Sequence, residues 1–323
     1  MAKPKVLFIQ PIHEDGMDRM AQVAEIIMAE RVDEDYVAKA AADVDAIIVR
    51  VSPITEKIIK AAKNLKVIGR HGVGYDNIDI AAATAAGVPV VYAPGTNTNA
   101  VAEQAIALMF ALAKHLVPAH EALKQNGDYG YRLRVRSCEL KGKTLGLVGL
   151  GNIGRRVAAF CQLGFGMKVV GTDPFLNEEA IKAAGLEIEV TDLDGVLQAA
   201  DFVSLHAPAK PDTYKIIGKR ELKLMKKTAY LINTARGPLV DEAALLEALQ
   251  EGEIAGAGLD VFDPEPPQGD NPIFQLPNVV VTPHMAAHSN ESLSVMALTV
   301  VENVIQVLNG ERPKDFVNPE VWE

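Results

Sequence analysis

Short apolar runs rich in β-branched residues alternate along the chain with longer segments in which polar and apolar residues are mixed. Buried parallel strands have the first character and crossover helices have the second. The pattern therefore predicts an α/β protein with buried parallel sheets. The expected strands form a first series at 5–9, 25–28, 46–49, 66–69 and 88–92, and a second at 144–148, 168–172, 186–189, 202–205, 229–233, 256–260 and 279–282.

Helical segments separate these runs. The segment 97–115 joins the two series and is almost entirely apolar, which predicts a helix buried between layers. Thr55 is placed to cap a shorter helix at 55–63. A last helix at 291–308 ends before Asn309-Gly310, a helix stop, and we expect the tail beyond to return to the first domain. Two similar α/β halves result.

Composition narrows the class of protein. A chain of 323 residues corresponds to about two domains at roughly 150 residues each. The 32 basic and 42 acidic residues give a net charge of -10, which argues against nucleic acid as the primary ligand. Cys138 and Cys161 fit neither a disulfide framework nor a zinc site, so we expect a reducing compartment, the cytoplasm. The longest uninterrupted apolar run, 105–113, is shorter than the ~18 residues of a membrane span, so no membrane segment is expected.

The strongest motif is a glycine loop between the expected strand 144–148 and a helix at 153–163. Gly149 permits the tight turn, Gly151 lets the backbone approach a pyrophosphate, and Gly154 lets the helix pack closely on the strand. The helix N-terminus, with Asn152 and Ile153, offers free N–H groups and positive dipole to phosphate. The alternative is a glycine-rich turn that serves packing alone.

Asp173 ends the next expected strand, about 20 residues beyond the last glycine, where a carboxylate can accept hydrogen bonds from the ribose hydroxyls of a dinucleotide. It would repel a 2'-phosphate. The motif therefore predicts NAD as the cofactor, in preference to NADP.

Three further segments follow expected strands of the second series, at the sheet edge where α/β proteins bind ligands. They carry Arg236, Glu265 and His284. An imidazole with an intrinsic pKa of ~6.5 can exchange a proton near neutral pH, and a guanidinium fork suits a carboxylate. Taken singly, these residues have structural alternatives: a surface ion pair for the arginine, a loop carboxylate for the glutamate and a helix-start residue for the histidine.

The segments GLVGLGNIGR, INTARGPLVDEAAL, GLDVFDPEPP and VVTPH resemble the D-isomer-specific 2-hydroxyacid dehydrogenases, and the similarity runs from RHGVGYDNID to the last helix. The resemblance implies a flavodoxin-like substrate domain at 1–97 and 289–323, and a Rossmann NAD-binding domain at 98–288. Both are expected to contain a doubly wound parallel sheet. It also implies a homodimer through the Rossmann domains.

The same resemblance assigns roles to residues of the second domain. Arg236 would bind the carboxylate and carbonyl of the substrate, His284 would act as general acid and base, and Glu265 would be its partner. Asp260 would bind the nicotinamide carboxamide, although an Asp at this place can also form a turn. The positions expected along the cofactor are His206, Ala207, Thr234, Ala235 and, in the first domain, Val73.

The glycine-rich loop 69–77 of the first domain can form a backbone nest for the substrate carboxylate, with Val73 and Gly74 as its candidate residues. His71 stands where the family often has a small residue, and it either touches the substrate or is structural. By the same resemblance, Arg50 matches a position that contacts the substrate phosphate in 3-phosphoglycerate dehydrogenases, although the neighbours Val51-Ser52-Pro53 differ from the usual ones.

The predicted function is interconversion of a D-2-hydroxy acid and its 2-keto acid with NAD. The expected enzyme types are 3-phosphoglycerate dehydrogenase, in a short form without a regulatory domain, and glyoxylate or hydroxypyruvate reductase. The alternative is an NAD(H)-sensing corepressor on the same fold, which retains a similar triad. His284 and His288 are four residues apart, but no third ligand is evident, so no metal site is predicted.

Overall fold

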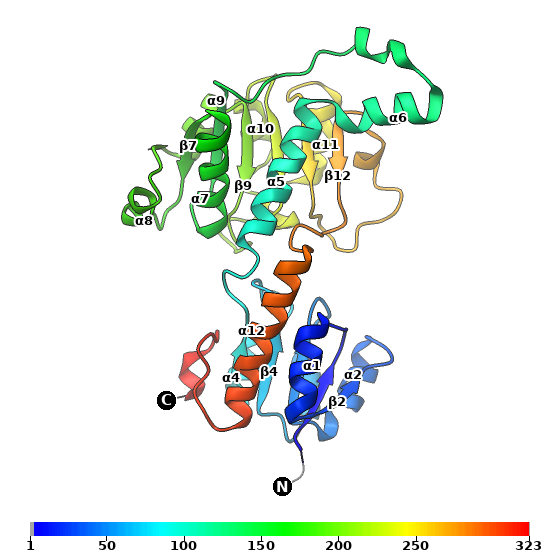
Figure 1. The fold of residues 1–323 in the computed structure, drawn as a ribbon, viewed down its shortest axis with the longest axis vertical. Coiled ribbons are helices and arrows are strands. Elements are labelled where there is room, and N and C mark those ends of the chain that lie inside the picture. The colour runs from blue at the N-terminus through cyan, green and yellow to red at the C-terminus, as the bar shows by residue number, and fades with distance from the viewer. Residues whose placement is uncertain (1–2, 323) are drawn as a thin grey trace. The chain divides into compact units, whose positions relative to one another are not determined.

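The structure is a computed structural model that describes residues 3–322, and it divides into two compact units. Unit 1 joins the chain up to Asn97 with the segment that begins at His288. Unit 2 is Thr98–Ala287. Each unit contains one parallel sheet with helices on both faces, so the α/β class predicted from the strand pattern is confirmed (Figure 1).

Unit 1 is built on a five-stranded sheet in the order β2-β1-β3-β4-β5, and all its strand pairs are parallel. Side chains alternate between its two faces, so Val6 and Phe8 pack toward α1 and α12 while Leu7 packs toward α2 and α3. The elements are β1 (Lys5–Phe8), α1 (Glu14–Val23), β2 (Glu25–Met28), α2 (Glu34–Ala40), β3 (Ala46–Val49), α3 (Glu56–Ala61), β4 (Val67–Arg70), α4 (Ile80–Ala85), β5 (Val90–Val91) and α12 (Asn290–Leu308).

The helix α12 comes from the end of the chain but belongs to the core of unit 1 (Figure 1). A Cβ on Gly69 would lie 2.8 Å from Val304 Cγ2, so glycine lets this helix approach β4 closely. By length and composition α12 could span a bilayer, but half of it is buried inside the protein, as for a core helix. The tail then returns to β5, where Asn318 Oδ1 accepts a hydrogen bond of 2.8 Å from Val90 N–H. The tail therefore lies against the sheet of unit 1.

Unit 2 contains a seven-stranded parallel sheet in the order β12-β11-β10-β9-β6-β7-β8. The α5 and α7 helices pack on one face, and α9, α10 and α11 pack on the other (Figure 1). The elements are α5 (Thr98–Ala113), α6 (Leu116–Asn126), β6 (Thr144–Val148), α7 (Asn152–Ala159), β7 (Lys168–Thr172), α8 (Glu178–Ala183), β8 (Ile188–Val190), α9 (Leu193–Ala199), β9 (Phe202–Leu205), α10 (Lys219–Leu224), β10 (Tyr230–Asn233), α11 (Glu242–Gln250), β11 (Gly256–Leu259) and β12 (Val279–Val281).

Three helix predictions need correction. The helix expected at 97–115 ends at Ala113, because His115 adopts a left-handed conformation with φ of 50°, and α6 continues at an angle of 62°. In the helix expected to reach residue 163, the α-helical part ends at Ala159, and residues 160–164 form a π-helical turn. Thr55 does occupy the N-cap position of α3, but its hydroxyl donates to Glu34 instead of capping the helix.

The order of strands in unit 2 sets the place of the site. The chain runs from β6 outward through β7 to β8, and then crosses back to β9 and runs the other way to β12. The neighbours β6 and β9 thus mark a topological switch point, where ligands of open parallel sheets bind at the carboxyl ends of the strands. At this point His206 N–H donates a hydrogen bond of 2.7 Å to Val148 O.

Candidate active site

The glycine loop leaves the carboxyl end of β6 in a conformation that only small residues permit. Gly149 has a φ of +99°, and a Cβ there would lie 2.7 Å from the backbone of His206. A Cβ on Gly154 would lie 2.1 Å from the Gly149 carbonyl oxygen. A Cβ on Gly151, by contrast, would meet nothing within 4 Å. The loop is therefore closely packed at its two ends and open at Gly151, the position predicted to approach a pyrophosphate.

The first turn of α7 suits an anion. Gly151 occupies the N-cap position of this helix and has no side chain that could accept hydrogen bonds from the first-turn N–H groups. The first turn also contains no acidic residue. The N–H groups of a first helical turn lack partners within the helix, and the helix dipole adds positive potential there. Asn152 is exposed and Ile153 is half-buried in this turn. These residues fit the phosphates of a dinucleotide.

Asp173 lies beside the same loop. Its Oδ2 accepts a hydrogen bond of 2.7 Å from Leu150 N–H, and its Oδ1 accepts one of 2.8 Å from Phe175 N–H. The two bonds fix the carboxylate at the end of β7, next to the glycine loop. This is a suitable place for contact with the ribose of an adenine nucleotide.

The residues predicted along the cofactor follow β9 and β10. Burial lowers the pKa of His206 to about 4, so its imidazole is neutral near pH 7, and Nε2 lies 2.9 Å from Ser204 Oγ. Thr234 is buried, and its hydroxyl has no hydrogen-bond partner among the residues that the structure describes. Ala207 and Ala235 are half-buried. The Thr234 hydroxyl, buried and unbonded by any described residue, lies at the same end of the sheet as the glycine loop. It is therefore a candidate contact for a ligand.

Arg236 begins the loop after β10 and is half-buried. Its Nη1 donates a hydrogen bond of 2.7 Å to Ala235 O, and its own carbonyl accepts one of 2.9 Å from the side chain of Asn233. A Cβ on the next residue, Gly237, would lie 1.9 Å from Phe262 O. Glycine here brings the loops after β10 and β11 together, which places Arg236 near Glu265.

Glu265 and His284 form a direct pair. His284 Nδ1 and Glu265 Oε2 are 2.6 Å apart, and Glu265 Oε1 accepts a bond of 3.0 Å from Phe262 N–H. Burial acts to raise the pKa of Glu265, but the hydrogen bonds from His284 and Phe262 and the charge of Arg236 together hold it below the usual value. The carboxylate therefore stays ionised beside the imidazole.

Asp260 shapes the turn that carries His284. It is fully buried, and its Oδ1 accepts hydrogen bonds from Thr282 Oγ1 at 2.5 Å and Met285 N–H at 2.9 Å. Its Oδ2 accepts one of 2.8 Å from Ala286 N–H, and its carbonyl accepts one of 2.8 Å from His284 N–H. These bonds hold His284 at a φ of 48°, an uncommon left-handed conformation. The predicted contact of Asp260 with a nicotinamide stays a prediction.

In unit 1, Val73 and Gly74 lie half-buried in the loop after β4. Two residues earlier, His71 is only 3% exposed, and its Nε2 has no hydrogen-bond partner among the described residues. Burial and the charges of Arg50 and Arg70 lower the pKa of His71 to about 3. The imidazole is therefore neutral and dry.

Arg50 is held in place at the end of β3. Its N–H donates a bond of 3.0 Å to Gln10 Oε1, its Nη1 donates one of 3.3 Å to Pro11 O, and its Nη2 lies 3.3 Å from His288 Nε2. Burial without a compensating carboxylate lowers the pKa of Arg50. His288 thus lies beside Arg50 in unit 1 and is not part of the Glu265 pair. No group of three potential metal ligands occurs within residues 3–322.

Arg70 is a further charged residue of this loop that is not among those expected from the sequence. Its guanidinium donates to the carbonyl of His71, and a Cβ on Gly72 would collide with it, so glycine lets the arginine lie across the loop. Arg70 ends β4 as Arg50 follows β3, and the two strands are neighbours. The available signal was this pair of arginines at adjacent strand ends.

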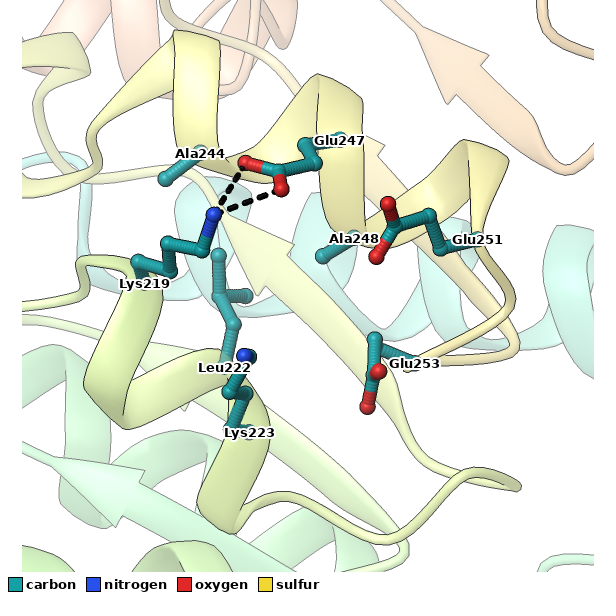
Figure 2. A pocket seen from close by; sticks show the side chains of 8 residues that line it. All are labelled: Lys219, Leu222, Lys223, Ala244, Glu247, Ala248, Glu251 and Glu253. Carbon is teal, nitrogen blue, oxygen red and sulfur yellow. Dashed lines mark hydrogen bonds and ion pairs between the residues drawn. The ribbon is translucent and has the colours of Figure 1, made fainter.

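A shallow surface pocket between α10 and α11 is distinct from this site. Figure 2 shows Lys219 paired with Glu247, whose carboxylate oxygens lie 2.6 and 2.8 Å from the ammonium nitrogen. The other residues that line the pocket are Leu222, Lys223, Ala244, Ala248, Glu251 and Glu253. It contains none of the residues predicted for catalysis or cofactor binding.

Comparison with known proteins bears on this site. The family model for "D-isomer specific 2-hydroxyacid dehydrogenase, NAD binding domain" matches residues 106–286. A D-3-phosphoglycerate dehydrogenase of Methanocaldococcus jannaschii is 42% identical over 97% of this chain, which spans 59% of that relative. A glyoxylate reductase of Korarchaeum cryptofilum is 39% identical, with 99% of this chain and 97% of the relative covered. The crystal structure of a Sinorhizobium meliloti NADPH-dependent glyoxylate/hydroxypyruvate reductase with NADP and malonate has a TM-score of 0.87 at 31% identity, covering 99% of this chain and 98% of that one.

Proposed function

The chain belongs to the D-isomer-specific 2-hydroxyacid dehydrogenase family, and we propose that it interconverts a D-2-hydroxy acid and its 2-keto acid with NAD. The observation that carries the proposal is the 2.6 Å contact between His284 and Glu265. These residues follow β11 and β12, while Arg236 and the glycine loop follow β10 and β6 of the same parallel sheet. An acid–base pair, an anion-binding group and a nucleotide loop thus share one sheet edge.

His284 acts as the acid and the base. Its Nδ1 faces Glu265, which leaves Nε2 to face the substrate oxygen. In reduction, Nε2–H donates its proton to the carbonyl oxygen as C2 gains a hydride, and in oxidation Nε2 takes the hydroxyl proton back. The hydride comes from, or goes to, the nicotinamide when that cofactor is bound. Glu265, ionised throughout, keeps the proton on Nδ1 and stabilises the imidazolium.

Arg236 binds the carboxylate of the substrate and polarises its 2-carbonyl. A planar guanidinium can contact both oxygens of a carboxylate, which an ammonium does less well. Its bond to Ala235 O and the close approach of Gly237 to Phe262 orient it before substrate arrives. Such preorganisation favours charge that develops on the carbonyl oxygen.

The preference for NAD rests on Asp173. Its carboxylate is held by Leu150 and Phe175 beside the glycine loop, so an added 2'-phosphate would meet negative charge there. The other proposed cofactor contacts are Gly149, Gly151, Asn152, Ile153, Gly154, His206, Ala207, Thr234, Ala235, Asp260 and Val73.

In unit 1 we assign the backbone N–H groups of Val73 and Gly74 to the substrate carboxylate. Arg50 and His71 are substrate contacts at the same sheet edge, and Arg70 adds a second guanidinium there. Two arginines near a neutral imidazole favour a substrate with a second anionic group, such as a phosphorylated hydroxy acid. A reductase of glyoxylate or hydroxypyruvate is the other enzyme type in contention.

Turnover tests the proposal. The measurement is NADH oxidation with glyoxylate, hydroxypyruvate and phosphohydroxypyruvate, together with NAD reduction by D-3-phosphoglycerate. A rate at least tenfold above background with one of them is expected, and a preference for the phosphorylated pair would support the role given to Arg50. No rate with any 2-keto or 2-hydroxy acid, together with tight NADH binding, would favour the alternative, an NAD(H)-sensing binding protein.

We extend the proposal to assembly and compartment. The α6 helix has no buried residue, and the segment that follows exposes Tyr129 at 66% and Leu133 at 81%. The exposed apolar side chains of α6 and of the segment after it support a homodimer through unit 2. Cys138 and Cys161 are free thiols, which supports the cytoplasm as the compartment.

A further inference from the structure

Two arginines follow each other on α7, and the structure places them differently. Arg155 Nη1 donates a hydrogen bond of 2.7 Å to Leu150 O, and its Nη2 donates one of 2.8 Å to Asn152 Oδ1. Arg156 points to another element, where its Nε donates a bond of 2.7 Å to Asn99 Oδ1 and its guanidinium lies 4.5 Å from the centre of the Phe160 ring. Only Arg155 reaches back across the glycine loop.

Arg155 is a cation close to the N-terminus of α7, which is an electrostatically unusual position. Cations are disfavoured near the positive N-terminal end of a helix. Yet its two hydrogen bonds go to the neutral acceptors Leu150 O and Asn152 Oδ1, and within residues 3–322 no ion pair contains it. The helix has no acidic residue in its first turn either. The positive charge gathered here suits an incoming anion.

The bond to Arg155 also fixes the orientation of the Asn152 side chain. A guanidinium has donors and no acceptor, so only the oxygen of the amide can face it. Because the two amide heteroatoms lie on opposite sides of Cγ, Nδ2 and its two hydrogens then face away from Arg155. Asn152 is exposed, and its neighbour Gly151 has open space above its Cα. Phosphate oxygens are acceptors that such a donor can bind.

Both backbone hydrogen-bonding groups of Leu150 have side-chain partners. Its N–H donates to Asp173 Oδ2 and its carbonyl accepts from Arg155. Its side chain is buried against Gly171, where an added Cβ would lie 2.9 Å from Leu150 Cδ2. Asp173 therefore holds the N–H side of Leu150, and Arg155 holds its carbonyl side. The contribution of Arg155 is to fix the conformation of residues 150–152.

We propose that Arg155 is a positioning residue for the pyrophosphate of the dinucleotide: it holds Leu150 and turns the Asn152 amide so that its N–H groups face the phosphates. This rests on the proposed function for the identity of the ligand. This role differs from the general role of the glycine loop. Arg155 determines whether the N–H groups or the oxygen of the Asn152 amide face the phosphates.

The experiment compares binding of three probes to variants of the full chain. NADH binding is followed by its fluorescence, and ADP-ribose and adenosine are measured by displacement of NADH. Arg155→Met is expected to weaken NADH and ADP-ribose about tenfold, the effect of losing one hydrogen bond to a charged group. Adenosine, which lacks the pyrophosphate, should bind within twofold of wild type. Arg156→Met is the matched control and should leave all three affinities within twofold.

A double-mutant cycle then separates positioning from direct contact. Asn152→Ala alone should weaken NADH about as much as Arg155→Met, and the double variant should be no weaker than either, because the two residues act as a unit. Arg155→Lys should not restore affinity, since one ammonium cannot replace the two-pronged bond.

Several results would overturn the inference: wild-type affinity in Arg155→Met, multiplied losses in the double variant, full rescue by lysine, or an equal loss of adenosine binding. Failure of the proposed function looks different. In that case wild type itself would bind no NADH, or would bind it without turning over any hydroxy or keto acid, and in the second case the cycle still tests Arg155.

Discussion

His284 and His71 carry the same side chain, but the two units surround it with opposite charges. In unit 2, His284 is 46% exposed in its side chain and lies 2.6 Å from the carboxylate of Glu265. In unit 1, His71 is buried, and the charges that act on it belong to Arg50 and Arg70. An imidazole beside a carboxylate can hold a proton near neutral pH, and one beside guanidinium groups in a dry site cannot.

The comparison shows why the presence of a histidine near strand ends does not define an acid–base group. Both residues follow parallel strands, and both lie in segments that were predicted to touch the substrate. Only the neighbours decide the role. His284 has the carboxylate partner that its proposed acid–base role requires, whereas His71 presents a buried, neutral imidazole.

The largest expected effect comes from removing His284. His284→Ala should lower kcat about a thousandfold, within the range for loss of general acid–base catalysis. NADH affinity, measured by fluorescence, should stay within about threefold of wild type, because the glycine loop is untouched. Comparable activity in this variant would remove His284 from the mechanism and would erase the contrast with His71.

Neutralising the partner of His284 should have the next largest effect. Glu265→Gln is expected to lower kcat about tenfold to a hundredfold, because the protonated imidazole loses the carboxylate that stabilises it. Since reduction needs that protonated form, the pH above which reduction slows should move downward. The check is the pH profile of keto-acid reduction. An unshifted profile would mean that Glu265 has a structural role only.

Changing Asp173 tests the carboxylate to which the preference for NAD is attributed. Asp173→Ser should raise the ratio of kcat/KM for NADPH to that for NADH about tenfold, because the charge that repels a 2'-phosphate is gone. Asp192→Ser, at the cap of α9, is a surface control that keeps the wild-type ratio. If both variants gave the wild-type ratio, cofactor preference would be decided elsewhere.

The smallest effect concerns His71 and appears in stability. Because its pKa falls to about 3 in the folded protein, from an ordinary value of 6.5, the unfolded state binds more protons between these two values. Its contribution to stability is therefore complete above pH 6.5 and is lost as the pH falls, by up to about 1.4 kcal/mol per pH unit. His71→Asn should flatten this dependence.

Urea unfolding of wild type and His71→Asn at pH 7, 6 and 5 measures the slope. The difference between the two free energies of unfolding should change steadily as the pH falls. A constant difference would show that folding does not lower the pKa of His71.

Much of the fold follows from local pattern. All twelve expected strands occur, because most strands of a parallel sheet are continuous apolar runs, although the edge strands β2 and β8 are partly exposed. Errors fall where helices end. The left-handed His115 and the π-helical turn after Ala159 have no clear composition signal, since a backbone conformation at one residue depends on what packs against it.

The sequence by itself determined the class of fold, the glycine loop and the three segments that bring Arg236, Glu265 and His284 to strand ends. It could do so because parallel strands direct their carboxyl ends to one edge, so local order along the chain implies nearness in space. It also placed Arg50 and His71 at corresponding positions of the first series.

Only the tertiary structure decided which of these groups touch. The bond between Glu265 and His284 joins residues of two loops, and the buried Asp260 sets the turn on which it depends. The position of Arg70 across its glycine loop and the reach of Arg155 to Asn152 follow from side-chain conformations. Contacts, burial and the charge around an imidazole depend on three-dimensional packing, and one-dimensional spacing does not contain them.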